Sequence, residues 1–86
     1  MILAKVTIYT TRFCPYCVRA KQLLTSKGVK FEEIPVDGRN DLRSDLLTRT
    51  GQRTVPQIWV GDTHVGGCDE LMALERRAQL DGMLAL

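Results

Sequence analysis

The chain has 86 residues, with 12 basic and 10 acidic side chains and a net charge of +2. This length predicts a single domain over residues 1–86, whose core buries roughly 60–65% of the unfolded surface. The scattered basic residues argue against nucleic acid as a main partner, and no apolar run approaches the ~18 residues of a membrane span.

The first half of the chain has the pattern strand, helix, strand. Residues 5–10 are rich in β-branched and aromatic side chains, which favour a strand. A helix is expected over residues 15–27, with Pro15 in its first turn and Gly28 as its stop. Residues 29–36 predict a second strand. Two strands joined by one helix are expected to pair in parallel through a right-handed crossover.

The second half adds two helices and a hairpin. The expected elements are a helix over residues 41–50, strands over 56–60 and 63–65, and a helix over 68–80. Asn40 or Asp41 is expected to cap the first of these helices and Gly51 to follow it, while Ala78 lies on the inward face of the last helix. The order predicts an α/β fold: a small four-stranded mixed sheet flanked by three helices.

The amino terminus suggests a cellular location, and this location bears on how the cysteines are interpreted. Residues 1–5 lack a basic segment followed by a long apolar one, so we expect no signal peptide and a cytoplasmic location. The chain has three cysteines. An odd number in such a location argues against a framework of structural disulfides and favours redox chemistry or metal binding.

Cys14 and Cys17 lie three residues apart where the first strand gives way to the first helix. Unpaired N–H groups at a helix start favour a thiolate, and Cys14 lies just before that start. Cys17 lies one turn into the helix and is expected to be more buried. We therefore predict that Cys14 is the nucleophile and that Cys17 resolves the mixed disulfide.

A zinc module is the alternative from a different class. Cys14, Cys17, His64 and Cys68 have the spacing C-x2-C … H-x3-C, which could form a Cys3His set. A complete α/β unit separates the two halves of this set, whereas a zinc site that staples a small fold normally replaces such a core. No metal is expected.

Three motifs follow one another along the chain: Cys14-Pro15-Tyr16-Cys17, Thr54-Val55-Pro56 and Gly66-Gly67-Cys68-Asp69. Together they resemble the dithiol class of the glutaredoxin family over roughly residues 5–80. The resemblance implies a thioredoxin-like fold, a monomer, and a redox-active disulfide between Cys14 and Cys17. It also implies glutathione as reductant or co-substrate, with disulfide-bonded or glutathionylated proteins as partners. Ribonucleotide reductase is a candidate partner at the family level.

The resemblance further implies a glutathione site made by Arg12, Tyr16, Arg43, Thr54, Val55, Pro56, Gly67, Cys68 and Asp69. Pro56 is expected to be cis, with the backbone of Val55 facing the tripeptide. The start of the last helix suits the γ-glutamyl carboxylate and Asp69 its amine, although Asp69 could also be a helix cap. Arg43 is expected at the glycyl carboxylate, with a solvated arginine as its alternative. Tyr16 would pack along the tripeptide.

Two positions leave questions open within the resemblance. Family members usually carry Lys where this chain has Thr11, so we expect activation of the thiolate and affinity for glutathione to differ from those of a typical member. Some relatives hold a [2Fe–2S] cluster between two protomers, but they usually carry Gly or Ser where this chain has Pro15. Cys68, at a helix start, is expected to have thiolate character and to act as a secondary oxidation site; a buried, inert thiol is the alternative.

Overall fold

The computed structural model describes residues 4–85, so Met1–Leu3, on which the signal-peptide expectation partly rests, and Leu86 lie outside the described residues. The elements are β1 (Val6–Thr10), α1 (Pro15–Ser26), β2 (Phe31–Pro35), α2 (Asn40–Thr50), β3 (Gln57–Val60), β4 (Thr63–Gly66), α3 (Cys68–Arg76) and α4 (Leu80–Leu84). Their order agrees with the sequence-based expectation as far as β4. The last helix differs, because it is divided into α3 and α4.

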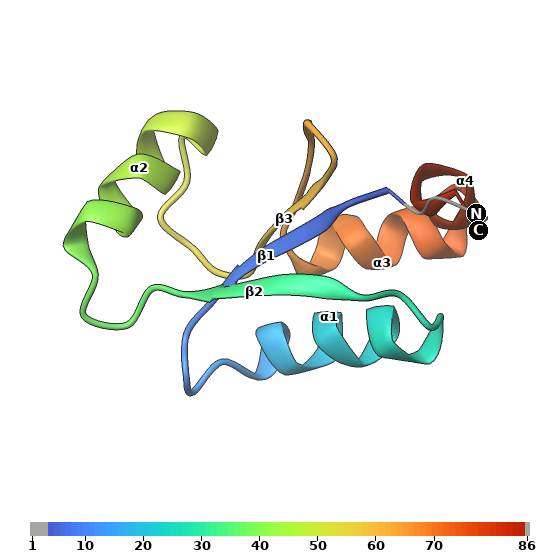
Figure 1. The fold of residues 1–86 in the computed structure, drawn as a ribbon, viewed down its shortest axis with the longest axis horizontal. Helices are drawn as coiled ribbons and strands as arrows, with labels where there is room; N and C mark the ends of the chain where they lie inside the picture. The colour runs from blue at the N-terminus through green and yellow to red at the C-terminus, as the bar shows by residue number, and fades with distance from the viewer. Residues whose placement is uncertain (1–3, 86) are drawn as a thin grey trace.

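The four strands form one mixed sheet in the order β2-β1-β3-β4. β1 pairs in parallel with β2, as the strand–helix–strand pattern predicts, and antiparallel with β3. β3 and β4 form the antiparallel hairpin. α1 and α3 lie side by side, whereas α2 lies beyond the carboxyl ends of β1 and β2 (Figure 1). The loop that leaves β1 therefore leads directly into the start of α1.

Alternation along the strands divides the buried side chains between the two faces of the sheet. Ile8 and Ile58 are fully buried in the larger cluster, which also takes in Leu24 of α1 and Leu71 of α3. Trp59, the next residue of β3, belongs to a smaller cluster formed with α2. The helices therefore pack on both faces, and the larger core lies beneath α1 and α3.

The predicted helix over residues 68–80 is wrong beyond Arg76. Ala78 has φ +56°, in the left-handed region, and its side chain is exposed rather than inward. The Gln79 N–H donates to the Leu74 carbonyl at 2.9 Å, which closes the helix end. This turn redirects the chain so that Leu80, at the start of α4, is fully buried.

Other boundaries differ by smaller amounts. β2 is shorter than predicted, because Val29 and Val36 are buried but lie outside the strand. α2 begins one residue earlier than expected, and its N-cap is Arg39, which makes no side-chain capping bond. The Asp41 carboxylate instead accepts two hydrogen bonds from the Arg39 guanidinium, at 2.9 and 3.1 Å. None of the helices within residues 4–85 is long and apolar enough to cross a membrane.

Candidate active site

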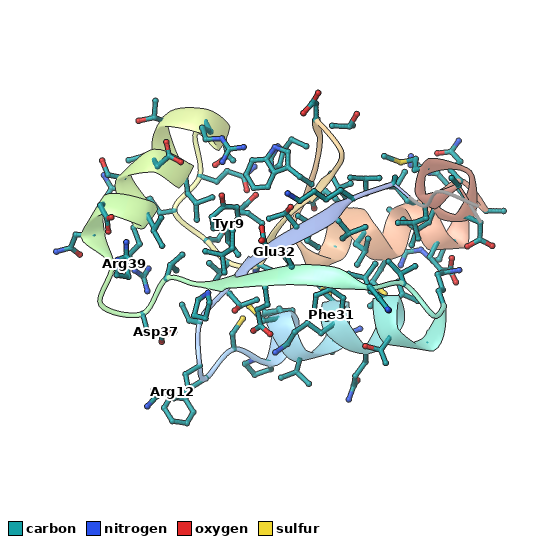
Figure 2. The ribbon with its side chains drawn as sticks, viewed as in Figure 1. Tyr9, Arg12, Phe31, Glu32, Asp37 and Arg39 are labelled. Carbon is teal, nitrogen blue, oxygen red and sulfur yellow. The ribbon has the colours of Figure 1, made fainter. Side chains whose placement is uncertain are left out.

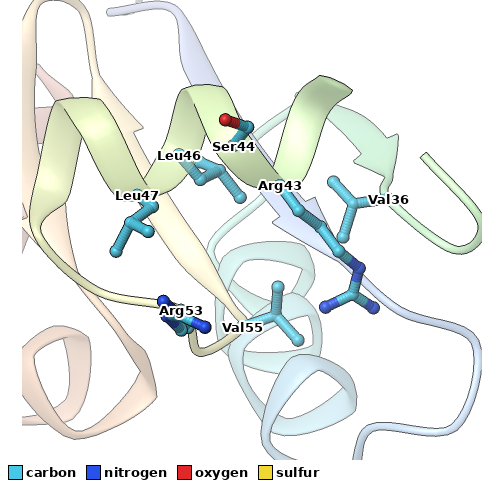
Figure 3. Close-up of a pocket in the computed structure, with 7 residues that line it drawn as sticks. All are labelled: Val36, Arg43, Ser44, Leu46, Leu47, Arg53 and Val55. Carbon is cyan, nitrogen blue, oxygen red and sulfur yellow. The ribbon is translucent and has the colours of Figure 1, made fainter. Parts of the chain in front are cut away.

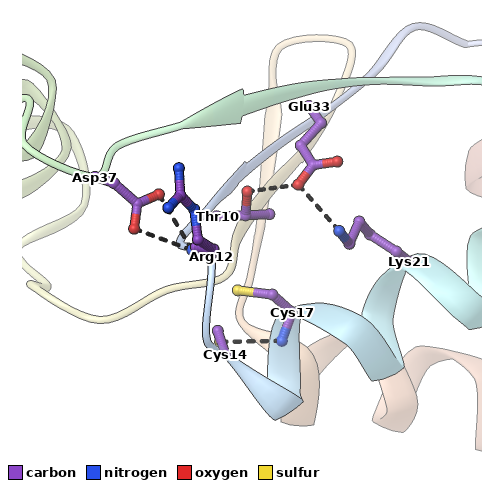
Figure 4. A network of polar contacts seen from close by, with 7 residues as sticks. All are labelled: Thr10, Arg12, Cys14, Cys17, Lys21, Glu33 and Asp37. Atoms are coloured by element: carbon purple, nitrogen blue, oxygen red, sulfur yellow. Dashed lines mark hydrogen bonds and ion pairs between the residues drawn. The ribbon is translucent and has the colours of Figure 1, made fainter.

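The dithiol lies at the start of α1. Cys14 is the N-cap residue, half-buried, and its Sγ accepts the backbone N–H of Cys17 at 3.1 Å (Figure 4). Its Sγ also lies 3.7 Å from the Val55 carbonyl oxygen. Pro15 occupies the first helical position, where its missing N–H leaves no bond unmade. Both thiols are free, and the predicted difference in exposure is confirmed: Cys17 is only 1% exposed.

The surroundings of Cys17 disfavour its thiolate. Burial, followed by the contact with Cys14, raises the pKa of Cys17 to about 12. The backbone of Thr11 and the ammonium of Lys21 act in the opposite direction on this pKa. Thr11 therefore contributes through its main chain, a role that its side-chain identity could not indicate.

A polar network reaches the same helix turn from β1 and β2. The Glu33 carboxylate accepts the Thr10 hydroxyl at 2.7 Å and the Lys21 ammonium at 3.0 Å (Figure 4). The Thr10 hydroxyl, and then Lys21, hold the pKa of Glu33 below its usual value. The sequence analysis missed this network, although Lys21 lies one turn after Cys17 on α1, a spacing that places the two on one helix face.

Two cavities meet at Val55, next to Cys14. The first, of about 310 Å³, is lined by Val36, Arg43, Ser44, Leu46, Leu47, Arg53 and Val55 (Figure 3). The second, of about 300 Å³, is lined by Tyr16, Gln52, Thr54, Val55, Pro56, Gly67, Cys68, Asp69 and Glu70. Together they form a groove, called here the tripeptide groove, which is basic at the Arg43 end and acidic at the Asp69 end.

The predicted glutathione residues divide between these cavities. Arg43 lies in the first, and Tyr16, Thr54, Pro56, Gly67, Cys68 and Asp69 lie in the second. The Val55–Pro56 peptide bond is cis, as predicted. Arg12 lines neither cavity. Its backbone N–H donates to both oxygens of the Asp37 carboxylate at 3.1 Å, and it lies on the loop between β1 and α1 (Figure 2).

The start of α3 contains a carboxylate that the sequence analysis missed. Glu70 Oε1 accepts the Gly67 N–H at 2.8 Å. The available signal was the capping-box pattern, with Glu three residues after the N-cap. Gly66 has φ +114°, a backbone conformation that favours glycine, and an added Cβ would also displace the Glu70 side chain. The next two residues, Cys68 and Asp69, begin α3 and line the second cavity.

Cys68 is not the reactive thiol that its place at a helix start suggested. Its side chain is 4% exposed and belongs to the larger core cluster. Burial raises the pKa of Cys68, and the nearby Arg19 opposes this only in part. The expected thiolate character is therefore wrong, and the alternative of a buried thiol agrees with the structure.

The four candidate zinc ligands are not brought together. Within residues 4–85, no three His, Cys, Asp or Glu side chains are grouped so that they could hold a metal ion. His64, on β4, has other partners: its Nε2 lies 2.8 Å from Gln57 Oε1, and the centroid of its ring lies 4.7 Å from that of the Trp59 ring. The Cys3His arrangement is therefore not formed by the described residues.

The mixed sheet, the dithiol at the start of α1 and the cis-proline beside it define a thioredoxin-like protein. Comparison with known proteins narrows this class. A sequence model of the family described as glutaredoxin matches residues 6–65. A glutaredoxin from Pseudomonas aeruginosa is 61% identical over 80 residues, covering 93% of this chain and 95% of the relative.

Solved structures agree with this comparison. The solution structure of glutaredoxin from Brucella melitensis has a TM-score of 0.86 and 49% identity, covering 95% of this chain and 89% of that one. A buckwheat glutaredoxin–glutathione complex has a TM-score of 0.89 and 35% identity, covering 95% and 77%. The chain belongs to the glutaredoxin family, whose members are generally thiol oxidoreductases.

Proposed function

We propose that the protein is a glutathione-dependent thiol–disulfide oxidoreductase that reduces protein disulfides and glutathionylated protein thiols. The observation that carries this proposal is the tripeptide groove beside Cys14, with opposite charges at its two ends. Glutathione is an extended tripeptide with a glycyl carboxylate at one end and a γ-glutamyl carboxylate and amine at the other. Its central sulfur would then lie next to Cys14.

Each end of the groove suits one end of glutathione. Arg43 and Arg53 would take the glycyl carboxylate, since guanidinium groups recognise carboxylates well. The backbone N–H groups at the start of α3 would take the γ-glutamyl carboxylate, and the Asp69 carboxylate its amine. The Val55 carbonyl, 3.7 Å from Cys14 Sγ, lies where a ligand backbone could pair with it. The likeness to a glutaredoxin–glutathione complex supports the same assignment.

Deglutathionylation would need Cys14 alone. Its thiolate attacks the glutathione sulfur of the mixed disulfide, and the client cysteine leaves as a thiolate that takes up a proton. Cys14 then carries the glutathionyl group. The thiolate of a second glutathione attacks the sulfur of that group, which releases oxidised glutathione and restores the Cys14 thiolate.

Reduction of a protein disulfide would use both cysteines. Cys14 attacks one sulfur of the client and displaces the other as a thiolate. Cys17 loses its proton and attacks Cys14 Sγ, which frees the reduced client and leaves a Cys14–Cys17 disulfide. Two glutathione molecules then reduce this disulfide and become oxidised glutathione. We place the activity in the cytoplasm, where thiols such as these are kept reduced, and expect the protein to act as a monomer.

The test is an assay coupled to glutathione reductase and NADPH, with one glutathionylated substrate and one protein disulfide. Cys14→Ser should abolish both activities. Cys17→Ser should keep deglutathionylation and lose most protein-disulfide reduction, because only the second route needs the buried thiol. Equal loss of both activities in Cys17→Ser would contradict the assigned roles, and a wild-type protein inactive on both substrates would contradict the function.

A further inference from the structure

Exposed apolar surface is concentrated around the nucleophile. Among residues 4–85, the large hydrophobic side chains that remain exposed are Phe13 (90%), Tyr16 (56%) and Val18 (45%). All three flank Cys14 in the sequence. Contiguous apolar surface left in water commonly marks an interaction site, and the 90% exposure of Phe13 leaves it almost no packing role within the fold.

These side chains lie on two flanks of α1. Tyr16 lines the tripeptide groove. Val18 lines a separate, shallow groove of about 400 Å³ along the outer side of the helix, together with Lys21, Gln22, Thr25 and Ser26. The spacing of three and four residues places this second set on one helix face. No residue lines both grooves, so the outer groove is not an extension of the glutathione site.

We propose that Phe13 and Val18, together with this outer groove, form the docking surface for the polypeptide around the reacting cysteine of a client protein. The proposal rests on the proposed function and adds to it the side of α1 on which the client lies. Glutathione and the client would lie on opposite flanks of α1 and meet at Cys14. The occupant follows from the chemistry: the client's disulfide, or its mixed disulfide with glutathione, must be brought to Cys14 Sγ. Phe13, next to Cys14 in the chain and 90% exposed, is free to contact the polypeptide around that disulfide.

Charge adds a second feature of the client. The Arg12 side chain, next to Phe13 in the sequence, is exposed and takes part in no ion pair within residues 4–85. None of the residues that line the outer groove is acidic, and its one charged residue, Lys21, is already paired with Glu33. The client segment that fits this docking surface has an apolar residue beside its cysteine and acidic residues further out.

The experiment compares three glutathionylated peptides with a small substrate, the mixed disulfide of glutathione and mercaptoethanol. The first peptide carries Leu beside its Cys and Asp at its flanks, the second replaces Leu with Ser, and the third replaces Asp with Lys. Wild-type protein should have its highest kcat/KM on the first peptide. Phe13→Ser should raise KM for that peptide by about tenfold, the loss expected when most of one apolar contact is removed. Val18→Ser should act in the same direction but more weakly.

The matched control is Phe13→Leu, which keeps an apolar side chain and should stay within about twofold of wild type. Both Phe13 variants should turn over the small substrate at the wild-type rate. Equal kcat/KM on all three peptides, or an unchanged KM in Phe13→Ser, would overturn the docking surface. Equal loss on peptide and small substrate would also overturn it, because Phe13 would then be acting on Cys14. Failure of wild-type protein on the small substrate would instead count against the proposed function itself.

Discussion

Lys21 lies one helical turn from the buried Cys17 and is held by Glu33 at 3.0 Å. A thiol with a pKa of about 12 is almost entirely protonated at neutral pH, and the Lys21 ammonium lowers that pKa while burial raises it. Any step that needs the Cys17 thiolate is therefore favoured by this cation, in addition to the Thr11 backbone. Deglutathionylation, which uses Cys14 alone under the proposed function, is not.

We expect Lys21→Met to slow protein-disulfide reduction about three- to fivefold, an effect of under about 1 kcal/mol, as is usual for a partly exposed charge. Its pH–rate profile should shift to higher pH, since losing the cation raises the pKa of Cys17 further. The measurement is kcat at saturating client between pH 6 and 9. Lys30→Met removes the same charge from an exposed position outside this network and should leave the profile unchanged. An unshifted profile in Lys21→Met would show that the cation does not act on Cys17.

Asp69 is exposed in the second cavity and free to meet a ligand amine. Asp69→Ala should raise KM for glutathione substrates about tenfold or more, since a hydrogen bond to a charged group contributes roughly 1.5–3 kcal/mol. Steady-state kinetics with varied substrate provides the measurement. Glu70→Gln is the comparison, because Glu70 bonds to the Gly67 N–H and should affect stability more than KM. An unchanged KM in Asp69→Ala would show that Asp69 does not bind the ligand amine.

At the scale of the elements, the break between α3 and α4 makes a prediction about stability. Ala78 is held at φ +56°, where a Cβ costs roughly 1–2 kcal/mol and glycine does not incur this cost. Ala78→Gly should therefore raise the free energy of unfolding by about 0.5–1 kcal/mol, after the greater chain entropy of glycine is subtracted. Ala73→Gly, inside α3, should lower it by about 1 kcal/mol. Urea titration of both variants tests the pair, and a loss of stability in Ala78→Gly would refute the argument.

The same break shows where sequence patterns stop being informative. Helical spacing relates Leu71, Leu74 and Ala78. Periodicity alone therefore predicts a helix that continues through Ala78. The stop depends on Leu80 reaching the core, which is a tertiary contact. In contrast, Gly51 ends α2 as predicted, because the left-handed conformation it adopts (φ +71°) is one that glycine favours locally.

The candidate site shows the same difference between local features, which the sequence predicts, and tertiary contacts, which it does not. The helix start is a local feature, so position along the chain predicted that Cys17 is more buried than Cys14. The cis bond at Pro56 was implied by the resemblance to glutaredoxins. The reading of Cys68 as a thiolate failed because a helix start does not reveal which side chains the core will cover. Glu33 was missed because a β2 carboxylate reaches α1 only once the sheet has formed.

At the scale of the whole molecule, the buried thiols link stability to pH. The pKa of Cys17 is raised from 9.0 to about 12, and that of Cys68 is raised as well. Between these values the unfolded chain gives up thiol protons that the folded chain retains. The free energy of unfolding should therefore fall as pH rises through this window.

Thermal unfolding under reducing conditions at pH 8, 9, 10 and 11 tests this prediction. Wild-type Tm should fall with pH, and Cys17→Ala should show a smaller fall, because its titrating thiol is gone. Lys27, whose raised pKa acts in the same direction through its bonds to Asp81 and Glu75, is present in both proteins. The difference between the two slopes therefore isolates Cys17, and parallel slopes would refute its contribution.

Trp59 is the only tryptophan in the sequence, and it lies on the sheet face that packs against α2. The Arg49 guanidinium of α2 lies over the indole ring, 4.3 Å from its centroid. The Tyr9 and Trp59 rings pack edge to face, with their centroids 5.4 Å apart. The protein thus contains its own fluorophore, whose surroundings depend on how α2 is seated rather than on the cysteines. A ligand that binds Arg43, which also lies on α2, should change the fluorescence emission of the Trp59 indole. Binding could then be titrated optically, without a label and without turnover.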